Sequence, residues 1–196
     1  LGMDARAFSA AQISALTTTN INGLATATVA ALSSAQIVAM DTDATALGTD
    51  KLAALTTLNI SGLTAAAMAK LTSAQVAALG DDASSLSGTD LDALTSTNIM
   101  GLSTSALAAM SSTKIATLAT DVRYLGSDNL AALTTSNISG LTAAALAVMT
   151  SADIAALGGD ASALTTAGMA ALTTANIGGL STVVMAAVSV VLPWST

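Results

Sequence analysis

The side chains that carry most enzyme chemistry are missing from this sequence of 196 residues. It contains no histidine, no cysteine and no glutamate, and its charged residues are five lysines and arginines and twelve aspartates. The usual general bases, thiolate nucleophiles and zinc ligands are therefore absent. A serine–lysine pair such as Ser112 with Lys114 remains, but serine is so frequent here that the pair carries little weight. We expect a chain that is not an enzyme and that holds no cofactor.

Without histidine and cysteine, a metal site in this chain would have to use oxygen ligands. Calcium is the ion such a site suits, because it is bound by six to eight oxygens, many of them from aspartate. The weak calcium candidates in the sequence are Asp41 with Asp43, and Asp81 with Asp82. This clustering is not kept along the chain, since Asp121 has no second aspartate beside it. We favour solvated turn and cap residues as the explanation of these aspartates.

The polar residues recur with a strict period. An asparagine followed by isoleucine recurs at intervals of 39 residues, and a glycine lies three residues after each asparagine: Asn20, Asn59, Asn98, Asn137 and Asn176, with Gly23, Gly62, Gly101, Gly140 and Gly179. The chain therefore holds five tandem units and no second domain, with approximate bounds of 1–39, 40–78, 79–117, 118–156 and 157–195.

Each 39-residue unit contains a shorter repeat, which consists of four segments of eight residues (octads) and one of seven. From Leu52 to Leu79 the apolar residues alternate between spacings of three and five. A spacing of three places two side chains on one helical face, and a spacing of five matches a hydrophobic staple across a helix start. Thr72 and Gln75 form a capping-box pattern inside the longer spacing. The pattern predicts short capped helices that are stable only when packed on neighbours, and hence an all-α solenoid.

A β-solenoid is the alternative fold, because threonine, isoleucine and valine favour strands. Strands require a period of two, which the octads lack, and alanine fills the intervening positions. The segments rich in glycine and aspartate, such as residues 80–90, are expected to be the wider turns.

Two regular polar columns have competing interpretations. The asparagines could form a hydrogen-bonded ladder or a ligand row, or they could be capping residues repeated with the unit, which we favour. The hydroxyl pairs could form a flat array that binds ice or a mineral, or they could be the N-caps that the helices need: Thr17–Thr18, Thr56–Thr57, Thr95–Ser96, Thr134–Thr135 and Thr173–Thr174. Capping explains these pairs without a lattice.

The two ends of the sequence differ from each other. Residues 190–196 occupy an octad but break its pattern, because Pro193 stands where the other units have an apolar β-branched residue. This segment is either a terminal cap or an assembly contact through Pro193 and Trp194. Leu1 continues the repeat phase and leaves the opposite end open. A head-to-tail contact between such ends would produce a polymer.

The octads resemble a pattern found in very large bacterial secreted and cell-surface proteins. Residues 71–79 (LTSAQVAAL) and 32–40 (LSSAQIVAM) are similar to the L-[ST]-[ST]-x-Q-[IV]-x-x-L arrays of adhesin-like proteins. The resemblance implies an extracellular or cell-surface location and a structural or adhesive role, and it transfers no binding residue.

These observations predict a structural repeat protein that associates with itself. It would be a subunit or segment of an extracellular filament, sheath, surface layer or adhesin stalk. The alternative is a non-catalytic module that binds calcium, glycan, ice or mineral. A net charge of −7 argues against nucleic acid as a partner, and the longest apolar stretch is too short to span a membrane.

Overall fold

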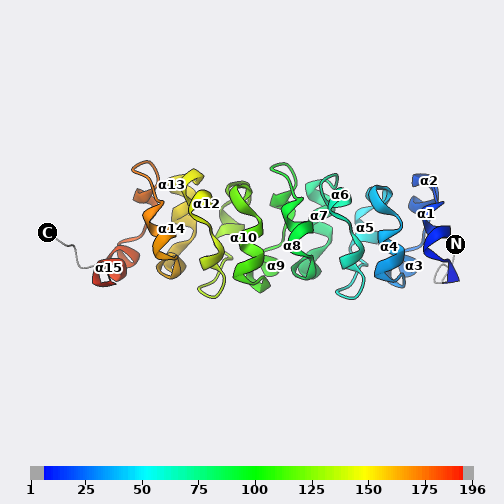
Figure 1. The fold of residues 1–196 in the computed structure, drawn as a ribbon, viewed down its shortest axis with the longest axis horizontal. Coiled ribbons are helices and arrows are strands. Elements are labelled where there is room, and N and C mark those ends of the chain that lie inside the picture. Colours follow the sequence, from blue (N-terminus) through cyan, green and yellow to red (C-terminus); the bar gives the residue numbers. More distant parts are fainter. Residues whose placement is uncertain (1–6, 192–196) are drawn as a thin grey trace. The chain divides into compact units, whose positions relative to one another are not determined.

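The computed structural model describes residues 7–191, with the side chains of residues 7–187. Within this range every regular element is a helix and none is a strand, which confirms the all-α solenoid and excludes the β-solenoid (Figure 1). No helix of the described range is long and apolar enough to cross a membrane. The chain divides into two compact units, Leu1–Ala106 and Leu107–Thr196.

Most α-helices have four to six residues, as the octads predict, and α15 with ten is the longest of the described range. Their bounds are α1 Ala10–Ser14, α2 Thr18–Asn22, α3 Thr26–Ala30, α4 Ser34–Val38, α5 Thr49–Leu52, α6 Ala65–Met68, α7 Ser73–Ala78, α8 Gly88–Asp92, α9 Thr104–Ala109, α10 Ser112–Thr117, α11 Ser127–Leu130, α12 Ala143–Val148, α13 Ser151–Ala156, α14 Thr166–Ala170 and α15 Thr182–Val191.

The 3₁₀ helices are of two kinds. Those of six residues occupy the segments rich in glycine and aspartate, and those of three residues follow the asparagines: η2 Asp41–Ala46, η4 Gly80–Ser85, η6 Ala119–Tyr124 and η8 Gly158–Ala163, then η3 Ile60–Gly62, η5 Ile99–Gly101, η7 Ile138–Gly140 and η9 Ile177–Gly179. The segments expected as wider turns are thus tight helical turns. An internal repeat such as residues 40–78 contains five elements, in the order η2, α5, η3, α6 and α7.

The ends of the helices follow the sequence rules. Thr72 accepts a hydrogen bond from the backbone N–H of Gln75, and the Gln75 side chain accepts from the backbone N–H of Thr72. Ser9 with Gln12, Ser33 with Gln36 and Thr150 with Asp153 form the same box. Each box starts a helix before the previous one can lengthen, which sets the octad length.

The way the elements stack was not predicted. In both units each element packs on the element three places further along the chain, so that α1 contacts α4, α5 contacts α7, and α11 contacts α13. Helices α1 and α4 begin at residues 10 and 34, so one turn of the solenoid takes about 24 residues. Three elements make a turn whereas five make a sequence repeat, so the 39-residue unit is not one layer of the stack.

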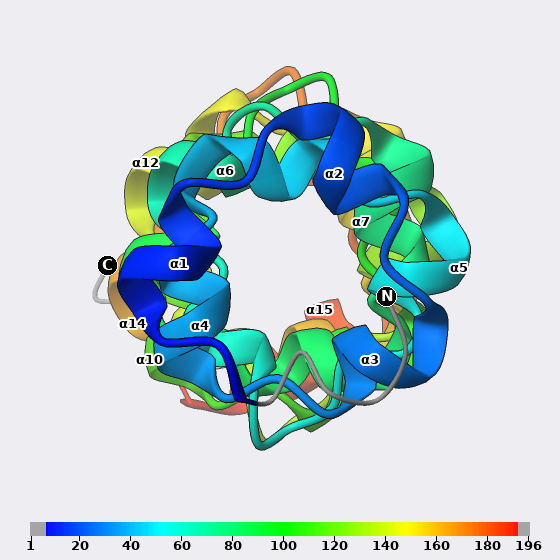
Figure 2. The same ribbon diagram turned by 90° about the vertical axis from the view of Figure 1, so that its right-hand side faces the viewer.

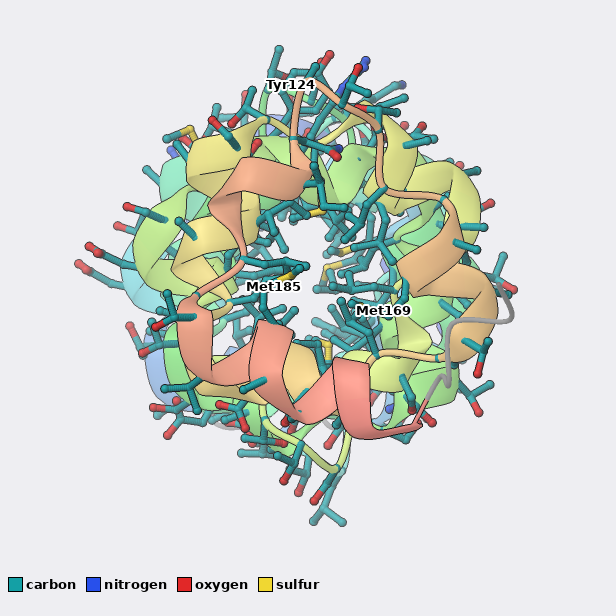
Figure 3. All side chains as sticks on the ribbon, turned by 90° about the vertical axis from the view of Figure 1, so that its left-hand side faces the viewer. Tyr124, Met169 and Met185 are labelled. Atoms are coloured by element: carbon teal, nitrogen blue, oxygen red, sulfur yellow. The ribbon has the colours of Figure 1, made fainter. Side chains whose placement is uncertain are left out.

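The core lies inside the turns. Within each unit the helices wind into a ring of backbone (Figure 2), and apolar side chains point inward while oxygen-tipped side chains point outward (Figure 3). The buried side chains are those of the octad pattern, among them Leu52, Leu63, Met68 and Val76. Because most of these side chains are aliphatic, the ring can close tightly around them.

A left-handed residue opens each of the four 3₁₀ helices of six residues. The four residues, one per repeat, have positive φ values: Asp41 (44°), Gly80 (55°), Ala119 (46°) and Gly158 (57°). A residue in this conformation ends the preceding α-helix, and glycine adopts it without the clash that a Cβ atom creates. Ala119 therefore carries a conformational cost that Gly80 and Gly158 do not.

We expect Ala119→Gly to stabilise the fold by about 1 kcal/mol, because it removes the left-handed alanine from an exposed position. The measurement is the urea midpoint followed by circular dichroism. The matched control is Ala116→Gly inside α10, where φ is helical and glycine should destabilise by about 1 kcal/mol. Equal effects of the two changes would contradict the interpretation.

Candidate functional site: the joint between consecutive turns

The most regular polar feature of the structure is the asparagine of each repeat. Its Oδ1 atom accepts a hydrogen bond from the backbone N–H of the threonine three residues earlier, at 2.8 Å for Asn59, Asn98 and Asn137 and 2.7 Å for Asn176. This is the capping role expected from the sequence. It fixes the direction of the chain as it enters the short 3₁₀ helix that follows.

The other side of the same amide joins two turns of the solenoid. Nδ2 of Asn98 donates to the backbone oxygens of Met68 and Leu71, both at 2.9 Å, and Asn137 and Asn176 make the equivalent pairs of bonds at 2.8–3.0 Å. In Asn59 the two bonds are 3.4 and 3.0 Å. All four side chains are only 1–2% exposed. The preference for capping alone was therefore wrong, because the amide caps its own turn and also bonds to the turn before.

The glycine three residues later lets the two backbones touch. A Cβ atom on Gly101 would overlap the carbonyl oxygen of Ser73 and approach Cβ of Val76 to 2.9 Å. The glycines Gly62, Gly140 and Gly179 meet the preceding turn in the same way. We call each asparagine, its glycine and the backbone they meet the asparagine–glycine joint. Only glycine allows this approach.

In the compact unit Leu1–Ala106, glutamine side chains make a second kind of hydrogen bond between turns. Nε2 of Gln75 donates to the backbone oxygens of Thr45 and Leu47 at 2.9 and 3.0 Å, and Nε2 of Gln36 donates to the Phe8 oxygen at 2.7 Å. These glutamines thus cap their own helix and bond to the preceding turn. No buried side-chain nitrogen or oxygen of the described residues lacks a hydrogen-bond partner.

The calcium candidates do not converge. Among the described residues no three acidic side chains lie close enough to share an ion. Asp41 accepts a hydrogen bond from the Thr64 hydroxyl at 3.1 Å, and Asp81 accepts from the Ser103 hydroxyl at 3.3 Å. Asp43 and Asp82 lie partly exposed in η2 and η4. Two of the four candidates thus link neighbouring turns.

Other predicted features lie elsewhere or fail to line up. Leu1, Pro193 and Trp194 fall outside the described residues, as does most of the divergent segment 190–196. The threonine pairs do not form a row on one face. Successive pairs are five elements apart, but a turn has three elements, so successive pairs lie at different positions around the ring. The flat array that ice or mineral binding requires is therefore missing from each described unit.

Two surface hollows of the described chain are shallow and lined by uncharged side chains. One of about 370 Å³ is lined by Ser112, Gly140, Thr142 and neighbouring small side chains, and another of about 510 Å³ by Phe8, Ser33, Gln36 and alanines. No titratable side chain lines either of these two hollows.

The chain matches no protein-family model, no curated protein and no solved structure.

Asn98→Asp should destabilise the first unit by about 2–4 kcal/mol, because it replaces the buried donor with an oxygen that faces two carbonyl oxygens. The matched control is Asn20→Asp. Asn20 makes the same capping bonds to Thr17 but is exposed, so its change should cost less than about 1 kcal/mol. Urea unfolding followed by circular dichroism gives both values, and equal losses would refute the bonding between turns.

Gly101→Ala should cost about 3 kcal/mol, because the new methyl group meets backbone atoms that cannot move aside independently. Gly48→Ala is its control, since a Cβ atom there has nothing within 4 Å and the change should stay within about 1 kcal/mol. Thermal unfolding of the two variants decides the matter. A tolerated alanine at residue 101 would show that the turns are further apart than described.

Proposed function

We propose that this chain is a self-assembling structural subunit, or a segment, of an extracellular filament, sheath, surface layer or adhesin stalk. The observation that carries the proposal is the apolar face of the last described turn. Ile177 and Met185 are 43% and 45% exposed, whereas the residues one repeat earlier, Ile138 and Leu146, are fully buried. The solenoid interface between turns is thus left uncovered where the next turn would lie.

The rest of the molecule supports a geometric role. Every buried side-chain nitrogen and oxygen of the described range already has a hydrogen-bond partner, so none is left over for a ligand. The aspartates that could attract calcium lie apart or pair with hydroxyl groups. An acidic surface with a net charge of −7 favours solubility of the lateral faces, which directs association to the apolar ends.

The extracellular location rests on composition and on the resemblance of the octads. An acidic chain with few lysines and many serines, threonines, alanines and glycines is common among secreted bacterial surface proteins. The octads of residues 32–40 and 71–79 resemble those of large adhesin-like proteins. A stack of short helices with small side chains provides length from little sequence variety, which suits a spacer or a wall of a polymer.

Electron microscopy of the purified chain over a range of concentrations tests the proposal. We expect fibres, tubes or sheets whose length or area increases with concentration, because association continues wherever an end stays open. Isolated particles of one size at every concentration would contradict self-assembly and would favour a spacer or binding module.

Calcium separates this function from the binding module. The thermal midpoint of a structural solenoid should be the same with added calcium and with a chelator, because no acidic cluster of the described residues holds the ion. Magnesium at the same ionic strength is the control for general screening of charge. A rise specific to calcium of several degrees would favour the binding module.

A further inference from the structure

We propose that the first turn of the solenoid is a docking surface for the last turn of a second copy of this chain. The two copies would be held by the same asparagine–glycine joint that holds consecutive turns within each unit. This inference rests on the proposed self-assembly and specifies which surfaces meet. The donor surface consists of Asn20 and Gly23, and the acceptor surface consists of Ile177, Met185 and the backbone of α15.

Asn20 has half of its joint complete. Its Oδ1 atom accepts from the Thr17 hydroxyl at 2.8 Å and from the Thr17 backbone N–H at 3.2 Å, as the capping role requires. Its Nδ2 atom donates to no atom of the described residues, and the side chain is exposed, while the four later asparagines are buried. The amide therefore projects an unused pair of donors in the geometry that takes two carbonyl oxygens in the turns that follow.

Gly23 also differs from the later glycines of the repeat, because no backbone from another turn of the described chain lies against it. At Gly62, Gly101, Gly140 and Gly179 a Cβ atom would overlap a serine carbonyl oxygen of the preceding turn. At Gly23 the nearest atoms are the backbone oxygens of Asn20 and Thr19 at 3.4 and 3.6 Å, which belong to its own turn. Nothing in the described chain makes glycine necessary here, whereas the approach of another turn would.

The last turn supplies the matching acceptors. Asn176 donates to the oxygens of Leu146 and Met149, and the residues 39 positions after these two are Met185 and Val188 in α15. Because a backbone carbonyl has two lone pairs, it can accept the amide in addition to its helical bond. Ile177 and Met185 are exposed in this last turn, whereas their equivalents one repeat earlier are buried, and Figure 3 shows Met185 pointing into the ring. The chain thus carries both halves of one interface on opposite end turns.

A second copy is the occupant that continuity with the internal interface favours. The joint is made four times within the described chain, with the same spacing of 27 residues to one acceptor. The contact is heterologous, because the donor and acceptor surfaces are different, so each added copy leaves one of each exposed. Association would therefore continue without closing.

Two variants block one surface each. Gly23→Val adds bulk where a Cβ atom makes only ordinary van der Waals contact with its own turn, so the fold should persist while the approach of another turn is prevented. Met185→Lys places a charge on the exposed acceptor surface. Gly48→Val is the control, because it adds the same side chain at a glycine away from both end turns with nothing within 4 Å. Circular dichroism and the thermal midpoint verify that each variant is folded.

Sedimentation velocity over a concentration series gives the decisive result. We expect the natural chain and Gly48→Val to form growing assemblies, and Gly23→Val and Met185→Lys each to remain single chains. An equal mixture of the two blocked variants should form a one-to-one dimer and nothing larger, because only one donor surface and one acceptor surface remain intact. Asn20→Asp, whose fold should be unaffected, should weaken association at least tenfold.

The possible failures are distinguishable. If Gly23→Val assembles like the natural chain, this joint is wrong although self-assembly stands. If both blocked variants stay single and their mixture forms no dimer, the contact is not head-to-tail and the inference is overturned. If the natural chain is a single chain at every concentration, the proposed self-assembly fails as well, and a preceding segment of a longer chain or another protein covers the first turn.

Discussion

The structure depends on one constraint: a helix of four to six residues cannot satisfy its own backbone. Helices this short are unstable in water, and each break leaves carbonyl groups without intrahelical donors. In this chain the breaks lie next to a closed apolar core, where an unpaired carbonyl is costly. The asparagine amide resolves both problems, because its oxygen starts the next short helix while its nitrogen bonds to two carbonyls of the turn before. Each buried asparagine thereby fixes its turn to the preceding turn of the same unit.

The mismatch between the sequence repeat and the solenoid turn follows from this arrangement. A repeat has five elements and a turn has three, so α4 packs on η3 and α7 packs on η5, and neither pair consists of equivalent segments. The interfaces between turns therefore join unlike surfaces. At each asparagine–glycine joint one surface donates the hydrogen bonds and the other supplies the carbonyl oxygens that accept them. Features that recur every 39 residues are distributed around the ring, which is why no row of threonines and no row of aspartates forms within a unit.

Much of the fold could be predicted from the sequence because it depends on local rules. The spacing of Leu71 and Val76 and the pairing of Thr72 with Gln75 specify a capped helix and its buried face, and both are as expected. The number of octads in a turn could not be predicted, because the same apolar pattern is compatible with any closed ring of short helices. The second role of Asn98 was considered, as a hydrogen-bonded ladder, but not preferred for the same reason, since its acceptors lie 27 and 30 residues away and only the turn length brings them near. The repeated glycine was the available signal, because an invariant small residue beside a buried amide indicates close backbone approach.

Neither end turn of the described chain covers the surface by which the internal turns pack on one another. A solenoid is usually closed by a terminal repeat with a polar outer face, which removes the apolar surface from water. The last described turn does the reverse, because it exposes Ile177 and Met185, whose equivalents one repeat earlier are buried. The first described turn retains an amide nitrogen and a glycine that the internal turns use for contact with a preceding turn. Because one end turn offers donors and open backbone and the other offers carbonyls and apolar side chains, the two are complementary to each other and neither is complementary to itself. If copies of the chain associate through these turns, as we propose, this asymmetry favours head-to-tail association over a symmetric dimer.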